Sequence, residues 1–416
     1  MMDLLKVLRD KGTISEQDYQ MLENAAKQEA ATAATAAKQD KGLVLDSGSS
    51  ALKLKSADGN FKFQVGGRVM VDAAYYDEDK TELGSGAELR RARLFAKGVV
   101  YHDWFYKAQV DFAGNEVSIK DFFLGYSGMD ALNIVFGNQK EPFSLEELTS
   151  SKYITFMERG MPNSFAPGRN TGLSIFTKAD RWGLQAGYYF SGVENNNSPG
   201  KSSTSLTGRA YFAPLMSENS LVHIGGAASY RDGNGDDTVR FRERPESHVT
   251  DTRLVNTGNI EDYDNQTLYN VEAAAVFGPF SLQGEYTQTN VDNGAEDPSF
   301  NGYYVYGSWF LTGERRPYKG NYGVFGRVKP KSVVGKGGHG AWELAARYSA
   351  IDLEDSGIEG GKEANWTLGV NWYATPNIRF MANYVRAETD PTSVETNELA
   401  VDEKINIFQV RGQIDF

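Results

Sequence analysis

Apolar and polar residues alternate along most of the chain after residue 60. Because successive side chains of a β-strand point to opposite faces, such a segment predicts a strand with one apolar and one polar face. About sixteen segments of this kind recur, each of roughly the length that a tilted strand needs to cross a membrane. They lie near 61–77, 89–101, 104–114, 118–128, 132–141, 171–179, 182–192, 203–213, 221–232, 266–278, 280–290, 302–313, 341–352, 364–374, 378–388 and 404–416.

The connections between these segments alternate between short and long. Tight turns are expected at 102–103, 180–181, 278–279 and 376–377, and long polar loops at 78–88, 142–170, 193–202, 233–265, 291–301, 353–363 and 389–403. Short turns on one rim and long loops on the other are typical of outer-membrane barrels. The connection 314–340 is an exception, since it is long and basic where a short turn is expected. The pattern predicts an all-β fold, a sixteen-stranded antiparallel transmembrane β-barrel over 61–416 with an N-terminal helical arm.

The last predicted strand supports closure of the barrel. Phe408, Val410, Ile414 and Phe416 share one face of it, and the chain stops on an aromatic residue. A closed barrel has no free edge, and in lipid only helices and closed barrels satisfy their backbone hydrogen bonds.

The first 60 residues differ from the rest of the chain. Residues 1–40 predict two helices, the second of which becomes Ala-rich and has a thin apolar face. Two interpretations stay open: a frayed arm, or a periplasmic coiled coil that helps to join copies of the chain. Residues 41–60, rich in Gly, Ser and Asp, are expected to be a linker.

Composition narrows the class of protein. The 416 residues are 40% hydrophobic and include 22 Tyr, 23 Phe and no Cys. The mean hydropathy is −0.48, and no apolar run approaches the roughly 18 residues of a membrane helix. These values exclude a helical membrane protein but suit a barrel, and the lack of Cys suits an oxidising periplasm. The N-terminus has no long apolar core, so we expect any export signal to have been removed.

The net charge of −12 means that the surface as a whole does not attract anions or nucleic acid. Any preference for anions must come from where the cations lie. In the segment 89–101, alternation places Arg91, Arg93 and Lys97 on one face, and Arg68 is expected to join them from the preceding strand. Two interpretations follow: these cations pair with carboxylates across the lumen, or they attract anions into it.

Two long loops carry further candidates. The connection 142–170 holds too many apolar residues for a solvated loop, so it either folds into the lumen and sets the constriction or caps the outer rim. In the loop 233–265, Arg240 and Arg242 alternate with Phe241, which places both guanidinium groups on one side of an extended segment. Arginine suits oxyanions because its planar fork donates paired hydrogen bonds. The alternative is a mobile loop with solvated charges.

Enzyme chemistry has little support. The chain has 4 His and no Gly-x-Ser-x-Gly, His-Glu-x-x-His or Walker pattern. We therefore predict no catalytic residues, no metal ligands and no cofactor. Carboxylates are abundant, so a barrel enzyme and an adhesin that binds through its long loops remain as alternatives from other classes.

Six segments together resemble the phosphate-selective porin O/P family: 63–68, 89–93, 148–152, 157–159, 340–344 and 368–373. The resemblance covers roughly 60–416. It implies a sixteen-stranded trimeric porin of the Gram-negative outer membrane that takes up phosphate or polyphosphate. It also implies a lumen-folded third loop, a lumen-folded segment at 314–340 and a constriction serine pair at Ser150 and Ser151. The arginine ladder of the family falls on Arg68, Arg90, Arg91, Arg240 and Arg242.

The chain departs from the phosphate-specific members at the constriction. Glu147 stands where they carry a lysine, Arg93 stands where they carry an aromatic residue, and the charge pattern at 120–121 differs. A desolvated carboxylate at the narrowest point would repel phosphate, and far less so if it were paired. Arg93 is the partner that we expect for Glu147.

The sequence thus predicts a passive, anion-preferring outer-membrane porin for phosphate, pyrophosphate or polyphosphate. The alternative within transport is a less selective channel for organic acids, sugars or other small solutes, suggested by Glu146, Glu147 and Glu158. Expected partners are membrane lipid, outer-leaflet lipopolysaccharide, small anions and two further copies of the chain, with no nucleic acid. The predicted pore-lining residues are Arg68, Arg90, Arg91, Arg93, Lys97, Glu147, Ser150, Ser151, Lys152, Arg240 and Arg242.

Overall fold

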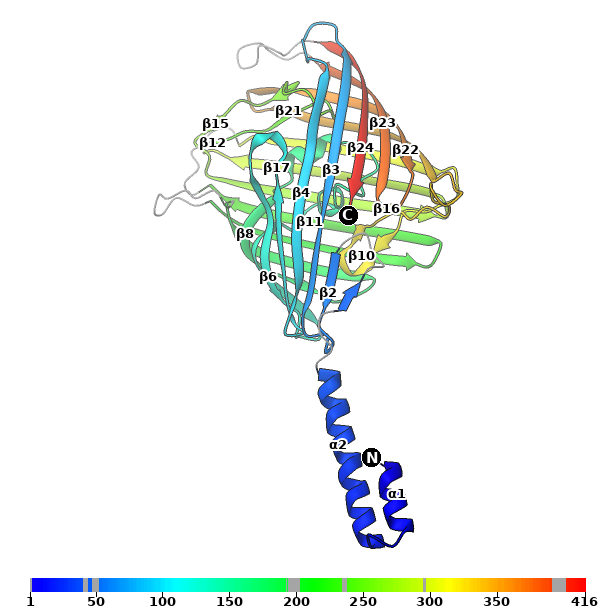
Figure 1. The fold of residues 1–416 in the computed structure, drawn as a ribbon. Helices are drawn as coiled ribbons and strands as arrows, with labels where there is room; N and C mark the ends of the chain where they lie inside the picture. The colour runs from blue at the N-terminus through cyan, green and yellow to red at the C-terminus, as the bar shows by residue number, and fades with distance from the viewer. Residues whose placement is uncertain are drawn as a thin grey trace.

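Sixteen antiparallel strands close into a barrel in the computed structural model of this chain (Figure 1). The structure describes residues 2–39, 44–46, 52–191, 193, 203–233, 238–294, 297–390 and 402–416. Each barrel strand pairs with its neighbours along the chain, and the last strand, β24, pairs with the first, β3, from Asn406 opposite Asp77 to Asp415 opposite Arg68. The barrel strands are β3 (Lys62–Asp77), β4 (Gly86–Val100), β5 (Trp104–Asp111), β6 (Ser118–Tyr126), β7 (Leu132–Lys140), β8 (Arg169–Thr177), β9 (Trp182–Phe190), β10 (Thr204–Met216), β11 (Ser220–Asp232), β16 (Asn265–Phe277), β17 (Phe280–Asp292), β18 (Ser299–Phe310), β21 (Ala341–Asp355), β22 (Ile358–Tyr373), β23 (Ile378–Asp390) and β24 (Glu403–Asp415).

All sixteen predicted strands are confirmed, with ends that differ by a few residues. The predicted long loop at 353–363 is wrong. There β21 and β22 continue as a hairpin, and only Ser356 and Gly357 lie between them. Both have positive φ, 50° and 79°, which matches the backbone twist of a two-residue hairpin turn. The polar composition of this stretch reflects strands that extend beyond the lipid rather than a loop.

The outward face of the barrel is apolar and carries a belt of rings. On β3, for example, Val71 and Tyr75 are exposed whereas Met70 is buried against the lumen. Rings of neighbouring strands stack near the rim with the short turns: Phe280 on Trp309, and Trp372 between Trp342 and Phe380. Aromatic side chains prefer the level of the lipid headgroups, so this belt marks one membrane interface.

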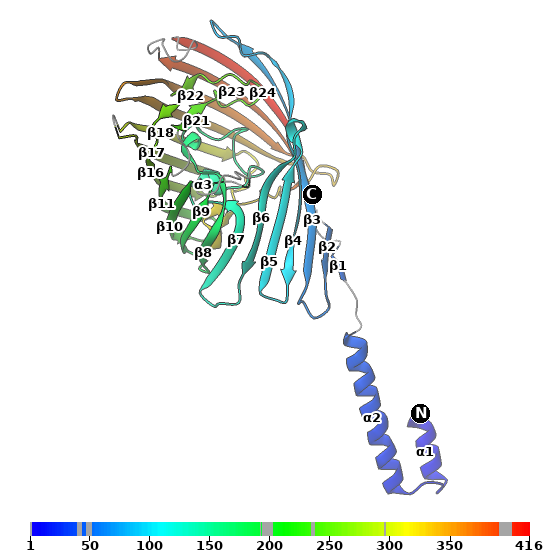
Figure 2. The same ribbon diagram turned by 90° about the vertical axis from the view of Figure 1, so that its left-hand side faces the viewer.

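Three connections fold into the lumen, as the side view in Figure 2 shows for α3. The third loop (141–168) contains α3 (Leu145–Leu148) and the 3-10 helix η2 (Met161–Phe165). The long loop (238–262) forms two small sheets, from β12 (Thr238–Val239) with β15 (Ile260–Glu261) and β13 (Arg242–Glu243) with β14 (Val255–Asn256). The basic segment (314–340) contains β19 (Tyr318–Lys319), η3 (Gly320–Tyr322) and β20 (Val324–Phe325).

Apolar cores join these segments to the inner wall. Phe165 of the third loop and Phe241 of the long loop pack with Phe300 of β18. Leu145 of the third loop and Phe325 of the basic segment pack with Val276 of β16. The inward folding of the third loop and of the basic segment is therefore confirmed. The apolar residues of the third loop fill the lumen instead of capping the rim.

The N-terminal region contains two helices and two short strands. Helix α1 (Met2–Asp10) packs on α2 (Glu16–Gln39), with the Arg9 guanidinium 4.6 Å from the centre of the Tyr19 ring. Within the predicted linker, β1 (Val44–Asp46) pairs with β2 (Leu52–Lys55), and β2 pairs with residues 62–65 of β3. No helix among the described residues combines the length and the apolar character needed to cross a membrane. A further 3-10 helix, η1 (Ala113–Asn115), follows β5.

Candidate functional site: the lumen constriction

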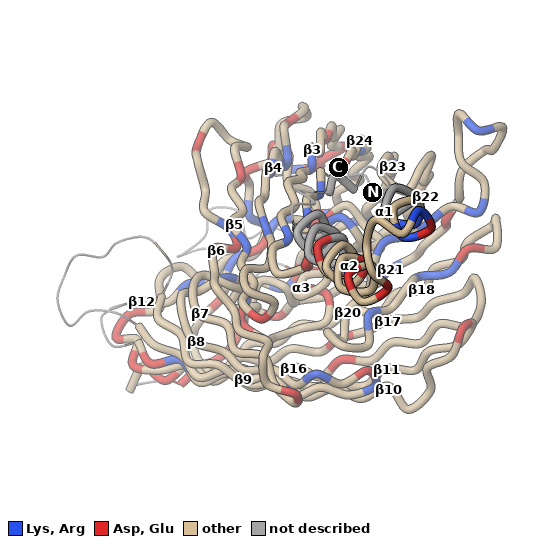
Figure 3. The backbone as a smooth tube through the Cα atoms, turned by 60° about the horizontal axis from the view of Figure 1, so that its bottom comes forward, with Lys and Arg blue, Asp and Glu red and all other residues tan. Residues whose placement is uncertain are grey.

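A cavity of about 730 Å³ lies between the inner wall and the third loop. Lys and Arg recur along β3, β4 and β5 on this side of the barrel (Figure 3). Eleven cations and two carboxylates line the cavity, which makes its formal charge strongly positive although the chain is acidic overall. The cations are Lys53, Lys55, Lys62, Arg68, Arg91, Arg93, Lys97, Lys107, Lys140, Arg159 and Arg169; the carboxylates are Asp121 and Glu147.

Arg68 faces two hydroxyl groups of the third loop. Its Nη1 donates to Ser151 Oγ at 2.7 Å and lies 3.3 Å from Ser150 Oγ. Within the described ranges, no carboxylate oxygen lies within 4 Å of this guanidinium. Arg68 is 6% exposed, so its charge is buried at the wall without a carboxylate in direct contact. Arg68 and the Ser150–Ser151 pair therefore lie together at the cavity wall.

The third loop is fixed by hydrogen bonds at its first turn. Ser144 Oγ accepts the amide N–H of Glu147, which caps α3, and Glu285 of β17 accepts the amide N–H groups of Leu145 and Glu146. A helix start exposes unpaired N–H groups that favour such acceptors. These bonds hold the Ser150–Ser151 turn against Arg68.

Glu147 lies in the cavity wall between two cations. Its carboxylate oxygens are 2.6 Å from Lys140 Nζ and 3.2 Å from Arg159 Nε. Burial alone would raise the pKa of Glu147, but Arg159 and Lys140 lower it to about 2. The expected Arg93–Glu147 pair is wrong, because Arg93 Nε instead donates to Asp111 of β5 at 2.6 Å. Asp111 stands directly opposite Arg93 on the neighbouring strand and is the nearer partner.

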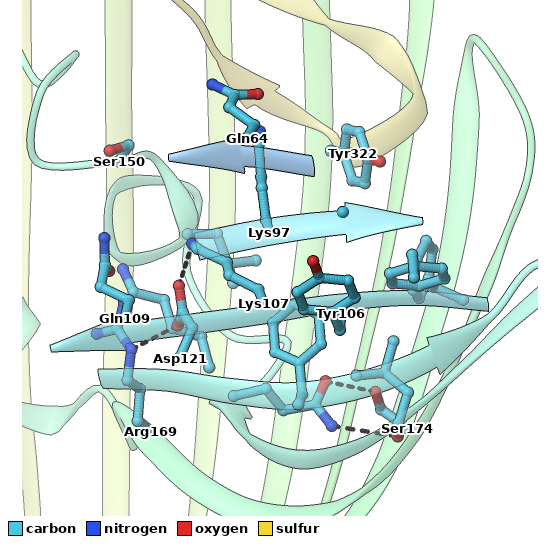
Figure 4. A pocket seen from close by; sticks show the side chains of 18 of the residues that line it. Gln64, Lys97, Tyr106, Lys107, Gln109, Asp121, Ser150, Arg169, Ser174 and Tyr322 are labelled. Carbon is cyan, nitrogen blue, oxygen red and sulfur yellow. Dashed lines mark hydrogen bonds and ion pairs between the residues drawn. The ribbon is translucent and has the colours of Figure 1, made fainter. Parts of the chain in front are cut away.

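Asp121 has the same arrangement on β6. Figure 4 shows its carboxylate joined to Lys107 of β5 and to Arg169 of β8, the latter at 2.7 Å. Each carboxylate of the cavity is therefore shared by two cations, and each group of three keeps one net positive charge. The cavity stays cationic even where it contains Asp and Glu.

Arg90 and Arg91 both reach the lumen, although strict alternation would separate them. The pairing of β3 with β4 shifts by one residue between Met70–Arg91 and Val71–Leu89, which leaves Arg90 as the extra residue of a β-bulge. Arg90 binds both oxygens of Glu158 in the third loop at 2.8 and 2.9 Å, and Arg91 lies 3.8 Å from the same carboxylate. Burial raises the pKa of Glu158, but Arg90, Arg91 and Arg411 bring it well below its usual range. The Arg90–Arg91 pair thus holds the loop in place.

The other predicted site residues lie outside the cavity lining. Lys152 binds Asp415 at 3.0 Å. Arg240 and Arg242 are exposed on the long loop, on either side of buried Phe241, and Arg240 donates to Asn256 at 2.7 Å. Among the predicted residues, the structure brings together Arg68, Arg91, Arg93, Lys97, Glu147, Ser150 and Ser151.

Several lining cations were missed from the sequence. Lys107 lies at an inward position of β5, and Lys140 and Arg169 flank the third loop at the ends of β7 and β8. Alternation alone could have identified Lys107. Lys53 and Lys55 could not be found in this way, because their segment was expected to be a linker and its pairing with β3 is a tertiary contact.

Arginines of the other strands, β10–β24, also reach the lumen, and three of them bind buried carboxylates. Arg209 binds Glu272 at 2.5 Å and Arg347 binds Glu246 at 2.6 Å. Arg411 lies 2.6 Å from Asp72 and 2.7 Å from Glu158. Among the described residues, no group of three or more His, Asp or Glu side chains is arranged to hold a metal ion.

A closed sixteen-stranded barrel with an aromatic belt, segments folded into its lumen and a charged opening between them defines an outer-membrane porin, a channel-forming class of protein. Comparison with known sequences identifies the family. The model of the phosphate-selective porin O and P family matches residues 63–416, and the chain belongs to this family.

Individual relatives agree with this assignment. The chain is 31% identical to Porin O of Pseudomonas aeruginosa over 384 residues, which cover 82% of this chain and 86% of that one. It is 32% identical to an uncharacterized protein of Caulobacter vibrioides over 374 residues, 86% of this chain and 75% of the relative.

Solved structures share the fold. OmpT, an outer membrane protein of Vibrio cholerae, superposes with a TM-score of 0.55 at 15% identity, covering 86% of this chain and 98% of that one. An anion-selective porin from Comamonas acidovorans superposes with a TM-score of 0.54 at 14% identity, covering 86% of this chain and 100% of that one.

Proposed function

We propose that this protein is a passive, anion-preferring porin that takes up phosphate, pyrophosphate or polyphosphate, without enzymatic activity. The observation that carries the proposal is the balance of charge in the cavity, where eleven cations face two carboxylates. Walls of one charge and low dielectric constant focus the field in a narrow opening and concentrate the oppositely charged ion there. The net charge of the whole chain has little influence at that point, because salt screens it over about 8–10 Å.

The chemistry of the cavity wall beside the third loop suits an oxyanion. Arg68 offers a planar set of donors and the hydroxyl groups of Ser150 and Ser151 lie beside it. Lys97 adds a charge further along the wall and lies opposite Lys107 in the pairing of β4 with β5. Like charges directly opposite each other destabilise a sheet, and the cavity contains such a pair. Several shared and hydrated contacts allow an ion to enter and leave, which transport requires.

Two of the three carboxylates that suggested a channel for organic acids, sugars or zwitterions are paired with cations. Glu147 lies between Lys140 and Arg159, and Glu158 between Arg90 and Arg411. Both carboxylates have lowered pKa values and are ionised at neutral pH, when their cationic partners neutralise them. This argues for the anion channel over the less selective alternative.

The test is the reversal potential of the purified protein in a planar bilayer under a KCl gradient, for the native chain and for Arg68→Ala. A charge about 4 Å from a passing ion contributes about 1 kcal/mol even in water, so the chloride-to-potassium permeability ratio should fall about fivefold or more. Phosphate should block the chloride current of the native chain and should block the variant less.

The matched control is Arg386→Ala, which removes a guanidinium from the outward side of β23, where it is 3.3 Å from Glu388. A chloride-to-potassium permeability ratio near one in the native chain, or a preference for potassium, would favour the less selective channel for organic acids, sugars or other small solutes. An unchanged ratio in Arg68→Ala would refute the role of the constriction. If the purified protein conducts no ions at all, a barrel enzyme or an adhesin becomes the favoured function.

We also propose that the protein works as a homotrimer among membrane lipid and lipopolysaccharide, with residues 1–40 as a periplasmic coiled-coil arm, 41–60 as a connecting region and 61–416 as the channel domain. OmpT of Vibrio cholerae has been solved in a trimer form. Light scattering in detergent should give three times the chain mass, and deletion of residues 1–40 should reduce the trimer fraction. A stable monomer would contradict this part of the proposal.

A further inference from the structure

One side of the cavity is lined by rings. Phe105, Tyr106, Phe123, Phe176, Tyr189 and Tyr322 all contribute to its surface and are called here the aromatic chamber. Five of them come from β5, β6, β8 and β9, and Tyr322 comes from the basic segment. In Figure 4 the labelled rings of Tyr106 and Tyr322 lie on the opposite side of the cavity from Asp121, Arg169 and Gln109. A passage for hydrated inorganic ions alone does not require this apolar surface.

Glycines on the wall explain how the rings lie along it. A side chain at Gly125 would clash with the ring of Phe105, and one at Gly187 would clash with the ring of Tyr189. The ring of Phe105 therefore lies over a glycine of the neighbouring strand β6, and the ring of Tyr189 lies over a glycine of its own strand, β9. Tyr322 remains 47% exposed and closes the chamber from the side of the basic segment; its ring centre is 6.2 Å from that of Phe176.

Cations and rings follow one another in a single row across the wall. Lys97 of β4 pairs with Lys107 of β5, and Lys107 pairs with Phe123 of β6. Arg68 and the serine pair line the same cavity. A molecule with an anionic group beside these cations would place its remaining atoms against the rings.

We propose that the chamber is a binding site for organic anions whose charged head carries an aromatic or other flat apolar body, such as aryl phosphates. This inference rests on the proposed function, because it uses the same cations to hold the head group. It extends that function by assigning the apolar part of the cavity to the body of the solute. A volume of about 730 Å³ falls in the range of roughly 300–1,000 Å³ typical of sites for small organic ligands.

The test compares two probes with the same head group. Methyl phosphate and phenyl phosphate carry similar charge, and only the second has a ring. We expect phenyl phosphate to block the chloride current of the native porin at about tenfold lower concentration, because it removes more apolar surface from water. Inorganic phosphate, measured in the same bilayer, reports on the anion path by itself.

Variants locate the effect in the chamber. Phe123→Thr combined with Phe176→Thr should reduce the ratio of the two blocking concentrations to about one to two while methyl phosphate still blocks. Tyr322→Ser should lower the ratio in the same direction and leaves the barrel wall intact. The matched control is Phe122→Leu with Phe136→Leu on β6 and β7, where both rings face lipid and are 54% and 64% exposed. Correct folding is checked by the heat-modifiable mobility of each variant.

Each outcome decides between the two proposals. A ratio near one in the native porin, with methyl phosphate and phosphate still blocking, overturns the chamber and leaves the anion channel standing. The chamber is also overturned if Tyr322→Ser and the folded Phe123→Thr, Phe176→Thr variant both keep the native ratio of the methyl phosphate and phenyl phosphate blocking concentrations. Block by none of the three compounds overturns both proposals. A high native ratio that only the chamber variants reduce supports the assignment.

Discussion

The two sides of the lumen use the same residue types in different ways. On the side formed by β3–β9, most lining cations face an open cavity, and Arg68 has hydroxyl partners rather than a carboxylate. On the side formed by β10–β24, Arg209, Arg347 and Arg411 are buried and each is bound to one or more carboxylates. Arg68 faces the cavity, whereas Arg209, Arg347 and Arg411 donate to backbone carbonyl groups of the infolded segments.

The difference follows from what fills each side. The third loop and the long loop pack against β16–β22, where their polar atoms lose water and must find partners. Arg347 shows the consequence: it lies 2.6 Å from Glu246 of the long loop and 3.7 Å from Glu146 of the third loop, and it donates to the backbone of Glu158. On the cavity side Arg68 is also buried, at 6% exposed, yet it faces hydroxyl groups and an open cavity instead of a carboxylate.

The strongest test of this contrast removes a paired arginine. In Arg347→Met, Glu246 and Glu146 lose their buried counter-charge, and breaking a buried pair from one side typically costs about 3–5 kcal/mol. We expect unfolding in urea, followed by the heat-modifiable mobility of the barrel, to shift by that amount. Arg386→Met on the outward side should shift it by less than about 1 kcal/mol, as exposed pairs do. Equal effects would remove the distinction between the two sides.

Reversing a charge on the cavity side should change the ion selectivity and leave the stability of the barrel nearly unchanged. Lys97→Glu changes the charge of the cavity by two, which at about 8 Å from a passing ion amounts to about 1 kcal/mol in water, or roughly a fivefold loss of chloride preference. The free energy of unfolding should hardly change. Lys404→Glu at the exposed end of β24 serves as the control. A large loss of stability in Lys97→Glu would show that this lysine supports the fold.

The long loop offers a smaller, pH-dependent test on the filled side. Burial raises the pKa of Glu243 to about 7, while the amide N–H of Arg244 donates to it at 2.9 Å. The folded protein therefore holds this proton more tightly than the unfolded chain, and the stability that it contributes below about pH 4 is lost as the pH rises through about 7. Between pH 4 and pH 8 the native protein should lose up to about 3 kcal/mol of stability, a loss that Glu243→Gln should not show. Glu261→Gln, on the exposed end of the same loop, is the matched control.

The sequence predicted the strands well because alternation is a local property. A one-residue shift would turn every side chain of a strand to the other face, so the pattern fixes both the number of strands and their inward positions. Apolar residues in the third loop, such as Leu145 and Phe156, also indicated that this loop does not remain in solvent. Arg68, Arg91, Arg93 and Lys97 were placed on the inner wall by the same argument.

Pairing across strands could not be predicted in this way. The bulge at Arg90 depends on the register between β3 and β4, and the choice of Asp111 over Glu147 as the partner of Arg93 depends on which residue lies opposite. The two cations around Glu147 come from β7 and from the far end of the third loop. These contacts depend on the register between paired strands and on the folding of the third loop, so the alternation within a single strand does not reveal them.

The contact between Leu145 and Phe325 has a consequence for how the barrel assembles. Leu145 belongs to a connection on the rim with the long loops, and Phe325 to one on the rim with the short turns, yet both are buried in one core at the inner wall. Neither can reach the other until the strands between them have paired around a common axis. The inner surface of the channel is therefore completed only after these strands have paired, by a step that adds no strand to the barrel.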